Sequence, residues 1–92
     1  MAMNIIEEKI KAGAVIVDVR SPEEFEDEHF PNAVNIPVNV IQAQADSIGP
    51  KDKPVLLYCA SGARSALAAR FLKMAGFTDV MNAGGLWDMP GY

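Results

Sequence analysis

The sequence has very few of the residues that build metal sites or disulfides. Among its 92 residues there is one cysteine, Cys59, and one histidine, His29. A single cysteine excludes an internal disulfide, and it excludes a C-x-x-C pair for redox exchange or zinc binding. With one histidine in the whole chain, a His/Cys metal site is not expected either. We therefore predict a protein that has no metal ion and no other cofactor.

Basic runs and long apolar segments are also lacking. Eight Lys and Arg residues against twelve Asp and Glu residues give a net charge of -4. This balance argues against a nucleic-acid partner or an anionic membrane partner. The opening stretch MAMNIIEEKIKAG lacks the apolar core of a signal peptide, and no apolar run reaches the length that spans a membrane. We expect a cytoplasmic protein.

What is present fits one small domain that covers residues 1–92. Half of the residues are hydrophobic, and a chain this short leaves no room for a second core. The apolar runs at 14–19 and 55–58 predict strands that are buried on both faces, because they do not alternate with polar residues. Helical patterns separate the strands. The expected fold class is therefore α/β, with a mostly parallel sheet and right-handed crossovers.

Two helix signals occur in the first third of the chain. Apolar residues spaced along one face predict a helix over residues 3–12, which Gly13 ends. A second helix is expected to begin after Ser21, its N-cap residue, with Pro22 at the first helical position. Glu24 lies three residues after the serine and completes a capping box.

Further elements are expected in the remainder of the chain. The pattern predicts a short strand near 33–35 and then a helix from Pro37 through about Ile48. A strong helix is predicted to begin near Ala63 and to end at Gly76. The residues TDVMN then predict a last short strand, and the final ten residues predict a loop with one helical turn.

Cys59 lies at the end of the second buried strand, directly before a loop of small residues and a helix. Ligands of parallel α/β folds bind beyond the carboxyl ends of the strands. Small residues let successive amides point toward one centre, and the helix N-terminus adds partial positive charge. This arrangement should lower the pKa of the thiol and make it a nucleophile. The residues expected to form the anion-binding loop are Ala60, Ser61, Gly62, Ala63 and Arg64.

Other interpretations of the same stretch stay open. An isolated cysteine at a strand end is often only a small buried apolar residue. A phosphatase or an arsenate reductase would use a similar strand, loop and helix. Cysteine phosphatases, however, place one residue more between their cysteine and arginine than the four that separate Cys59 from Arg64. The shorter ring better fits a single extra sulfur on Cys59, and no second cysteine is present to act as a resolving thiol.

Four segments together resemble a single-domain rhodanese over nearly the whole chain. In order, they are VIVDVRSPEEF, EHFPNAVNIP, VLLYCASGARSALAARFLKMAGFTDV and NAGGLWDM. The resemblance implies a small, mostly parallel sheet of four to five strands with helices on both faces. Four strands are favoured, because the usual opening strand of the family has no counterpart here.

The resemblance also implies a thiosulfate sulfurtransferase. The Cys59 thiolate would take the sulfane sulfur of thiosulfate or a related small donor, and sulfite would leave. The persulfide would then pass its sulfur to cyanide or to a thiol acceptor, including a protein thiol. Many members carry arginine directly after the cysteine, where this chain has Ala60. That difference favours an alternative, a sulfur carrier that relays persulfide sulfur between proteins.

Several other residues each have a functional and a structural interpretation. Arg20 would bind the sulfonate part of thiosulfate by resemblance, or it would form a surface ion pair with an acid such as Glu24. Asp18 is expected to accept hydrogen bonds from loop backbone. His29 is either a general base or, as we favour, a turn residue. Leu86 and Trp87 either line the mouth of a pocket or form a hydrophobic lid over a small core.

Overall fold

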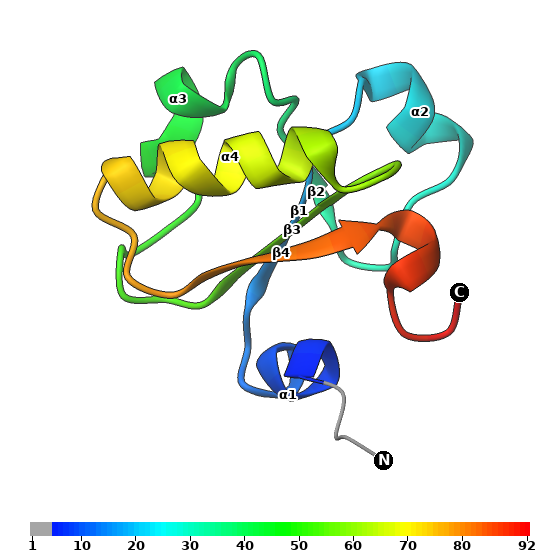
Figure 1. Ribbon diagram of the computed structural model, residues 1–92, viewed down its shortest axis with the longest axis horizontal. Coiled ribbons are helices and arrows are strands. Elements are labelled where there is room, and N and C mark those ends of the chain that lie inside the picture. Colours follow the sequence, from blue (N-terminus) through cyan, green and yellow to red (C-terminus); the bar gives the residue numbers. More distant parts are fainter. Residues whose placement is uncertain (1–4) are drawn as a thin grey trace.

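The fold is built on a parallel sheet of four strands. A computed structural model describes residues 5–92 (Figure 1). The strands are hydrogen-bonded in the order β2-β1-β3-β4, and every neighbouring pair is parallel. This arrangement confirms the expected α/β class with a sheet of four strands. The strands are β1 (Val15–Asp18), β2 (Val34–Asn35), β3 (Val55–Cys59) and β4 (Val80–Gly85).

Helices cover both faces of this sheet. Helices α3 and α4 lie on one side, and α1 lies on the other (Figure 1). Helix α4, with 12 residues, is the longest and follows β3 directly. The helical elements are α1 (Ile5–Lys11), α2 (Pro22–Asp27), α3 (Ile41–Gln44), α4 (Ala63–Met74) and the 3-10 turns η1 (Ala45–Ser47) and η2 (Leu86–Asp88).

The central strand β3 is buried throughout, and its alternate residues supply two separate cores. Leu57 and Cys59 pack with residues of β1, α3 and α4 on one face. Leu56 and Tyr58 pack with residues of α1 and of the C-terminal turn on the other face. An apolar run without alternation is what a strand covered on both faces requires.

The register of the sheet brings the ends of β1 and β3 together at one edge. Asp18 pairs with Tyr58, and the amide of Val19 donates to the carbonyl of Tyr58 at 3.1 Å. Val19 and Cys59 are the residues that follow this pair, and both belong to the same core. Residues that follow β1 consequently lie beside the loop that follows β3.

Several local predictions are confirmed. Ser21 caps α2, its hydroxyl accepts from the Glu24 amide at 3.2 Å, and the Glu24 carboxylate accepts from the Ser21 amide at 3.0 Å. Gly13 and Gly76 both have positive φ just after a helix, as expected for glycines at helix ends. Of the predicted first helix, residues 3 and 4 lie outside the described part of the chain.

The predicted helix from Pro37 is wrong in its first part. Helix α3 begins at Ile41, because the preceding residues use their backbone groups differently. The Val38 amide donates to the carbonyl of Val19 at 3.0 Å, and the Val40 amide turns back to Pro37. The segment 37–40 thus stays attached to the end of β1. Helix α3 and η1 then occupy the rest of the predicted range up to Ser47.

Within residues 5–92 we find no helix that is long and apolar enough to cross a membrane.

Tyr58 generates a prediction about stability. Its side chain is fully buried, and its hydroxyl oxygen accepts a hydrogen bond from the Phe30 amide at 2.9 Å. Tyr58→Phe removes that acceptor, so we expect the free energy of unfolding to fall by about 1 kcal/mol or more. The measurement is urea denaturation of both proteins.

Tyr92→Phe is the matched control for this experiment. The Tyr92 hydroxyl donates to the carbonyl of His29 at 3.2 Å in an exposed position. Its removal should change the free energy of unfolding by no more than about 0.5 kcal/mol. Equal losses in the two variants would show that burial of the Tyr58 hydrogen bond contributes nothing.

Candidate functional site

The candidate site is centred on the sulfur of Cys59. This residue ends β3 and is 1% exposed. The loop after it is short, because α4 begins at Ala63. Gly62 makes the tight turn into the helix with φ of +100°, a conformation that costs glycine little. The sulfur therefore lies at the N-terminal end of α4.

Two backbone amides and one hydroxyl group surround the sulfur. The Gly62 amide donates to it at 3.0 Å, and the Ser65 amide does so at 3.4 Å. The Ser65 hydroxyl lies 3.4 Å from the same atom. A ring of inward amides was expected from residues 60–64. The Gly62 amide lies within that range, and Ser65 lies one residue beyond it.

These donors favour the charged form of the thiol. Burial alone would raise the pKa of Cys59, but hydrogen bonds from the Ser65 hydroxyl and from the Ser65, Gly62 and Ser61 amides outweigh it and lower the pKa. A hydrogen bond donated to a thiolate is stronger than one donated to a neutral thiol. The site therefore favours the thiolate, which is the nucleophilic form of cysteine.

Asn82 of β4 holds the donors in place. Its Oδ1 lies 2.6 Å from the Ser65 hydroxyl, whose single hydrogen goes either to this oxygen or to the sulfur, and it accepts from the Gly84 amide at 2.9 Å. Its Nδ2 donates to the carbonyl of Gly62 at 3.1 Å. Asn82 therefore contacts both residues that donate to the sulfur, and it is a positioning residue. The sequence analysis missed it, although a polar residue in a short terminal strand was an available signal.

The glycine pair of β4 lets this strand approach the loop. A register shift in the β3–β4 ladder places Gly84 opposite Tyr58 and Gly85 opposite Cys59. A Cβ atom at Gly85 would overlap the carbonyl of Ala60. No larger residue fits there without moving the loop, so glycine at this position has a steric reason.

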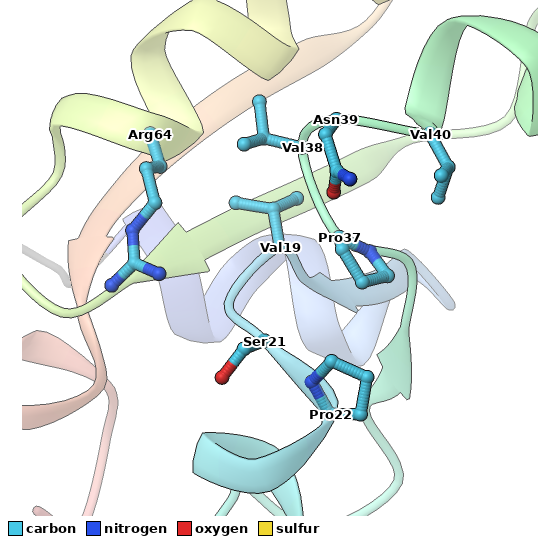
Figure 2. A pocket seen from close by; sticks show the side chains of 8 residues that line it. All are labelled: Val19, Ser21, Pro22, Pro37, Val38, Asn39, Val40 and Arg64. Carbon is cyan, nitrogen blue, oxygen red and sulfur yellow. The ribbon is translucent and has the colours of Figure 1, made fainter.

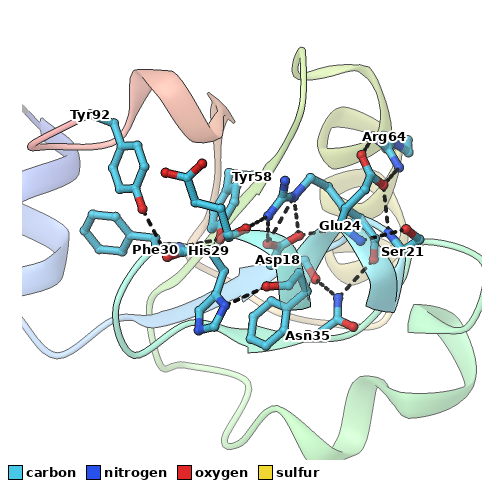
Figure 3. Close-up of polar contacts among 12 residues, drawn as sticks. Asp18, Ser21, Glu24, His29, Phe30, Asn35, Tyr58, Arg64 and Tyr92 are labelled. Carbon is cyan, nitrogen blue, oxygen red and sulfur yellow. Dashed lines mark hydrogen bonds and ion pairs between the residues drawn. The ribbon is translucent and has the colours of Figure 1, made fainter.

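Arg64 reaches from the first turn of α4 to α2. Its Nη1 and Nη2 donate to the two carboxylate oxygens of Glu24 at 2.8 and 3.1 Å (Figure 3). Hydrogen bonds from Arg64 and from the Ser21 amide lower the pKa of Glu24 to about 2, so the pair is ionised at neutral pH. The capping box of α2 thus fixes the carboxylate that orients Arg64.

Arg20 forms a buried ion pair with Asp18. It is 7% exposed and pairs with Asp18, whose Oδ2 lies 2.7 Å from Nη2. Of the two alternatives for Arg20, the surface ion pair with an acid such as Glu24 is not found, because the pair is buried, its partner is Asp18, and Arg64 occupies the Glu24 carboxylate. Asp18 also accepts from the Arg20 backbone amide at 2.9 Å, which confirms its predicted role toward backbone. Nη2 of Arg20 also donates to the carbonyl of Glu28 at 2.6 Å.

None of the other residues singled out from the sequence forms a hydrogen bond to the sulfur among residues 5–92. His29 stacks on Phe25 with ring centroids 3.7 Å apart, and its Nδ1 is 2.7 Å from the Phe25 carbonyl. Leu86 is buried in the core on the α1 face. Trp87 is 67% exposed and meets the Tyr92 ring edge-on. The contacts of His29 agree with its interpretation as a turn residue, and the burial of Leu86 agrees with its interpretation as part of a hydrophobic lid.

A pocket of about 430 Å³ lies beside the loop (Figure 2). Cys59 is not among its lining residues, but Val19, which belongs to the same core cluster as Cys59, and Arg64 are. Figure 2 shows Arg64 on the side opposite Val40. The lining residues are Val19, Ser21, Pro22, Pro37, Val38, Asn39, Val40 and Arg64. Across residues 5–92, no group of three or more His, Cys, Asp or Glu side chains could hold a metal ion.

The Ser65 hydroxyl is expected to control the reactivity of Cys59. Ser65→Ala removes one donor, so the pKa of the thiol should rise and less thiolate should be present at neutral pH. The measurement is the rate of iodoacetamide alkylation against pH, whose midpoint should move upward. Because thiolate accumulates as the pH rises through the pKa, the variant should react more slowly at neutral pH.

Ser61→Ala is the control in the same loop. Ser61 lowers the Cys59 pKa through its backbone amide and not through its hydroxyl, and the substitution keeps that amide. Its alkylation midpoint should match that of the unmodified protein. If Ser65→Ala left the midpoint unchanged as well, the hydroxyl would have no electrostatic role.

Comparison with known proteins identifies the family. Residues 3–87 match the family described as the Rhodanese-like domain. Thiosulfate sulfurtransferase PspE of Escherichia coli K12 is 39% identical over 74 residues, which are 79% of this chain and 71% of PspE. YrkF of Bacillus subtilis, a protein named as a sulfur carrier, is 40% identical over 67 residues, which are 73% of this chain and 36% of YrkF.

A solved structure agrees with these sequence matches. A structure described as a rhodanese with anions from E. coli superposes with a TM-score of 0.80 at 37% identity. The superposition covers 85% of this chain and 93% of the solved chain. The resemblance noted in the sequence is confirmed, and its match covers the strand, loop and helix that carry Cys59. The chain therefore belongs to the rhodanese family, whose relatives named here include a thiosulfate sulfurtransferase.

Proposed function

We propose that this protein transfers sulfane sulfur through a persulfide on Cys59. The observation that carries the proposal is the buried sulfur that accepts hydrogen bonds from the Gly62 amide and from Ser65 at the start of α4. Donors held in place before the reaction stabilise developing negative charge without reorganisation. Because relatives of this chain are named as sulfurtransferases, sulfur is the group that we propose is transferred.

Thiosulfate or a related small sulfane compound is the proposed donor. The Cys59 thiolate attacks the outer sulfur of thiosulfate, the sulfur–sulfur bond of the donor breaks, and sulfite leaves with the electron pair. The charge moves from Cys59 to the added sulfur. The substrate-binding residues in this proposal are Ala60, Ser61, Gly62, Ala63, Arg64 and Arg20.

Among these residues, Arg64 and the loop backbone have the stronger structural support. Arg64 is half-exposed, and it interacts electrostatically with Cys59. Arg20 is buried against Asp18, so it would have to give up part of that pair to bind a sulfonate. Its proposed contribution is therefore to the positive potential behind the site.

The second candidate function is a sulfur carrier that receives its sulfur from a protein persulfide. Ala60 supports it, because a methyl group replaces a cation next to the nucleophile and weakens attraction for a dianion such as thiosulfate. The match to YrkF also supports it. The two functions share the Cys59 persulfide and differ in the donor.

Intact-mass measurement tests the persulfide directly. After incubation with thiosulfate, the protein should gain the mass of one sulfur atom, and cyanide should remove it. Cys59→Ser should gain nothing while keeping its fold, because serine preserves the size of the side chain. A protein without added sulfur after treatment with both thiosulfate and a protein persulfide would overturn the proposal. Loading by the protein persulfide alone would select the carrier.

A further inference from the structure

The Ser65 hydroxyl has one hydrogen and several acceptors within reach. Its oxygen lies 2.6 Å from Asn82 Oδ1, 3.2 Å from the Gly62 carbonyl, 3.3 Å from the Gly84 carbonyl and 3.4 Å from the sulfur of Cys59. Ser65 is 0% exposed, so bulk solvent is not a partner. One hydrogen cannot serve all of these acceptors at full strength. The strongest acceptor of the moment therefore receives it.

The orientation of the Asn82 amide group is fixed by its two other partners. The Gly84 amide donates to Oδ1 at 2.9 Å, and Nδ2 donates to the Gly62 carbonyl at 3.1 Å. A flipped amide group would set two donors against each other at Gly84 and two acceptors against each other at Gly62. Oδ1 therefore faces Ser65, and it can only accept from the serine.

The charge on the sulfur decides between the two main acceptors. An oxygen-to-oxygen distance of 2.6 Å is short for a hydroxyl hydrogen bond, so Asn82 is the preferred acceptor while the thiol is neutral. Ser65 can then accept the hydrogen of the thiol, because either atom of that contact can be the donor. Once the proton of Cys59 has passed to solvent, the sulfur is an anion. A hydrogen bond to an ion is about twice as strong as one between neutral groups, so the hydroxyl then donates to the sulfur.

The exchange leaves every polar group with a partner. The Asn82 side chain is exposed, so water can replace the serine at Oδ1, and the Gly84 amide continues to donate to that oxygen. Ser65 is buried, so its hydrogen needs an acceptor from the protein in either state. Rotation of the hydroxyl group is sufficient to exchange the acceptors, and no backbone movement is required.

We propose that Asn82 is a positioning residue that acts on Cys59 through Ser65, by holding the serine hydrogen while the thiol is neutral and releasing it to the thiolate. Asn82 thus stabilises the neutral thiol, whereas the Ser65 hydroxyl stabilises the thiolate. The intrinsic nucleophilicity of a thiolate falls as its pKa falls. The opposition between the two residues therefore limits how far the thiol is acidified and keeps the thiolate reactive.

The same exchange would accompany each step of sulfur transfer, and this part of the inference rests on the function proposed above. When Cys59 carries an added sulfur, its own sulfur has two covalent bonds and no charge, so the serine hydrogen returns to Asn82. When an acceptor takes the outer sulfur, the sulfur–sulfur bond breaks and its electron pair stays on Cys59. The Ser65 hydroxyl then donates to the thiolate again.

The charged groups around the loop do not take part in this exchange. They belong to the end of β1, to α2, to α4 and to η2, and they are Asp18, Arg20, Glu24, Arg64 and Asp88. Among residues 5–92, none of them forms a hydrogen bond to Ser65 or to the Asn82 side chain. Arg64 interacts electrostatically with Cys59. All five are retained in the variants below, so their contribution to the thiol pKa is constant.

Two substitutions separate the oxygen of Asn82 from its nitrogen. Asn82→Leu removes both and fills a similar space, whereas Asn82→Asp keeps an acceptor oxygen and strengthens it with charge. Both variants lose the hydrogen bond from Nδ2 to Gly62, so a loosened loop would raise the thiol pKa in both. We expect opposite shifts instead. The pH midpoint of iodoacetamide alkylation should fall by about 0.5 unit in Asn82→Leu, and it should rise by at least as much in Asn82→Asp.

The same pair of substitutions in a Ser65→Ala background tests the route. Without the hydroxyl group, Asn82→Leu should no longer lower the midpoint, and the rise in Asn82→Asp should shrink to the effect of its charge through space. Gln44→Glu adds the same charge on the exposed surface of α3, and it should leave the midpoint unchanged. Urea denaturation verifies that each variant is folded. If Asn82→Leu does not fold, the shrinkage for Asn82→Asp decides the question.

The outcomes separate this inference from the proposed function. A midpoint that rises in Asn82→Leu would overturn the inference, because Asn82 would then act only by holding the loop. Equal shifts with and without the Ser65 hydroxyl would overturn it too. The titrations use protein without added sulfur, so a Cys59 that never loads with sulfur contradicts the sulfur-transfer proposal and leaves the result for Asn82 valid.

Discussion

The structure depends on one constraint, a sulfur that is buried yet must accept hydrogen bonds. A thiol enclosed by apolar residues would remain neutral, because burial disfavours the charged form. Here the Gly62 amide and the Ser65 amide and hydroxyl reach the same atom from the first turns of α4. The positive end of a 12-residue helix adds to their effect. Burial excludes water from the sulfur, and the protein donors supply the hydrogen bonds that water would otherwise make.

Several elements that look merely structural serve this constraint. Strand β4 approaches closely because Gly85 has no side chain, and this approach brings Asn82 within reach of Ser65 and Gly62. The capping box of α2 holds Glu24, which orients Arg64 beside the loop. The site is thus assembled from β1, β3, β4 and two helices. Its geometry follows from the carboxyl ends of parallel strands meeting at one edge.

The sequence predicted most of the elements but fewer of the contacts. Apolar runs at 14–19 and 55–58 reveal buried strands, and Ser21 with Glu24 reveals a cap, because these signals are local. The segment 37–40 was misjudged, since the hydrogen bond from the Val38 amide to the Val19 carbonyl joins residues distant in sequence. The same limit hid Asn82 and the partner of Arg20. The misjudged segment also lines the pocket, where tertiary contacts override local propensity.

The central claim is that the folded protein holds Cys59 as an ionised sulfur more readily than water does. Ultraviolet titration of thiolate absorbance tests this most directly, with Cys59→Ser subtracted to remove the tyrosine background. The account predicts a midpoint below about 8.5, the value of an unperturbed cysteine. A midpoint at or above that value would contradict it, because burial would then outweigh the surrounding donors.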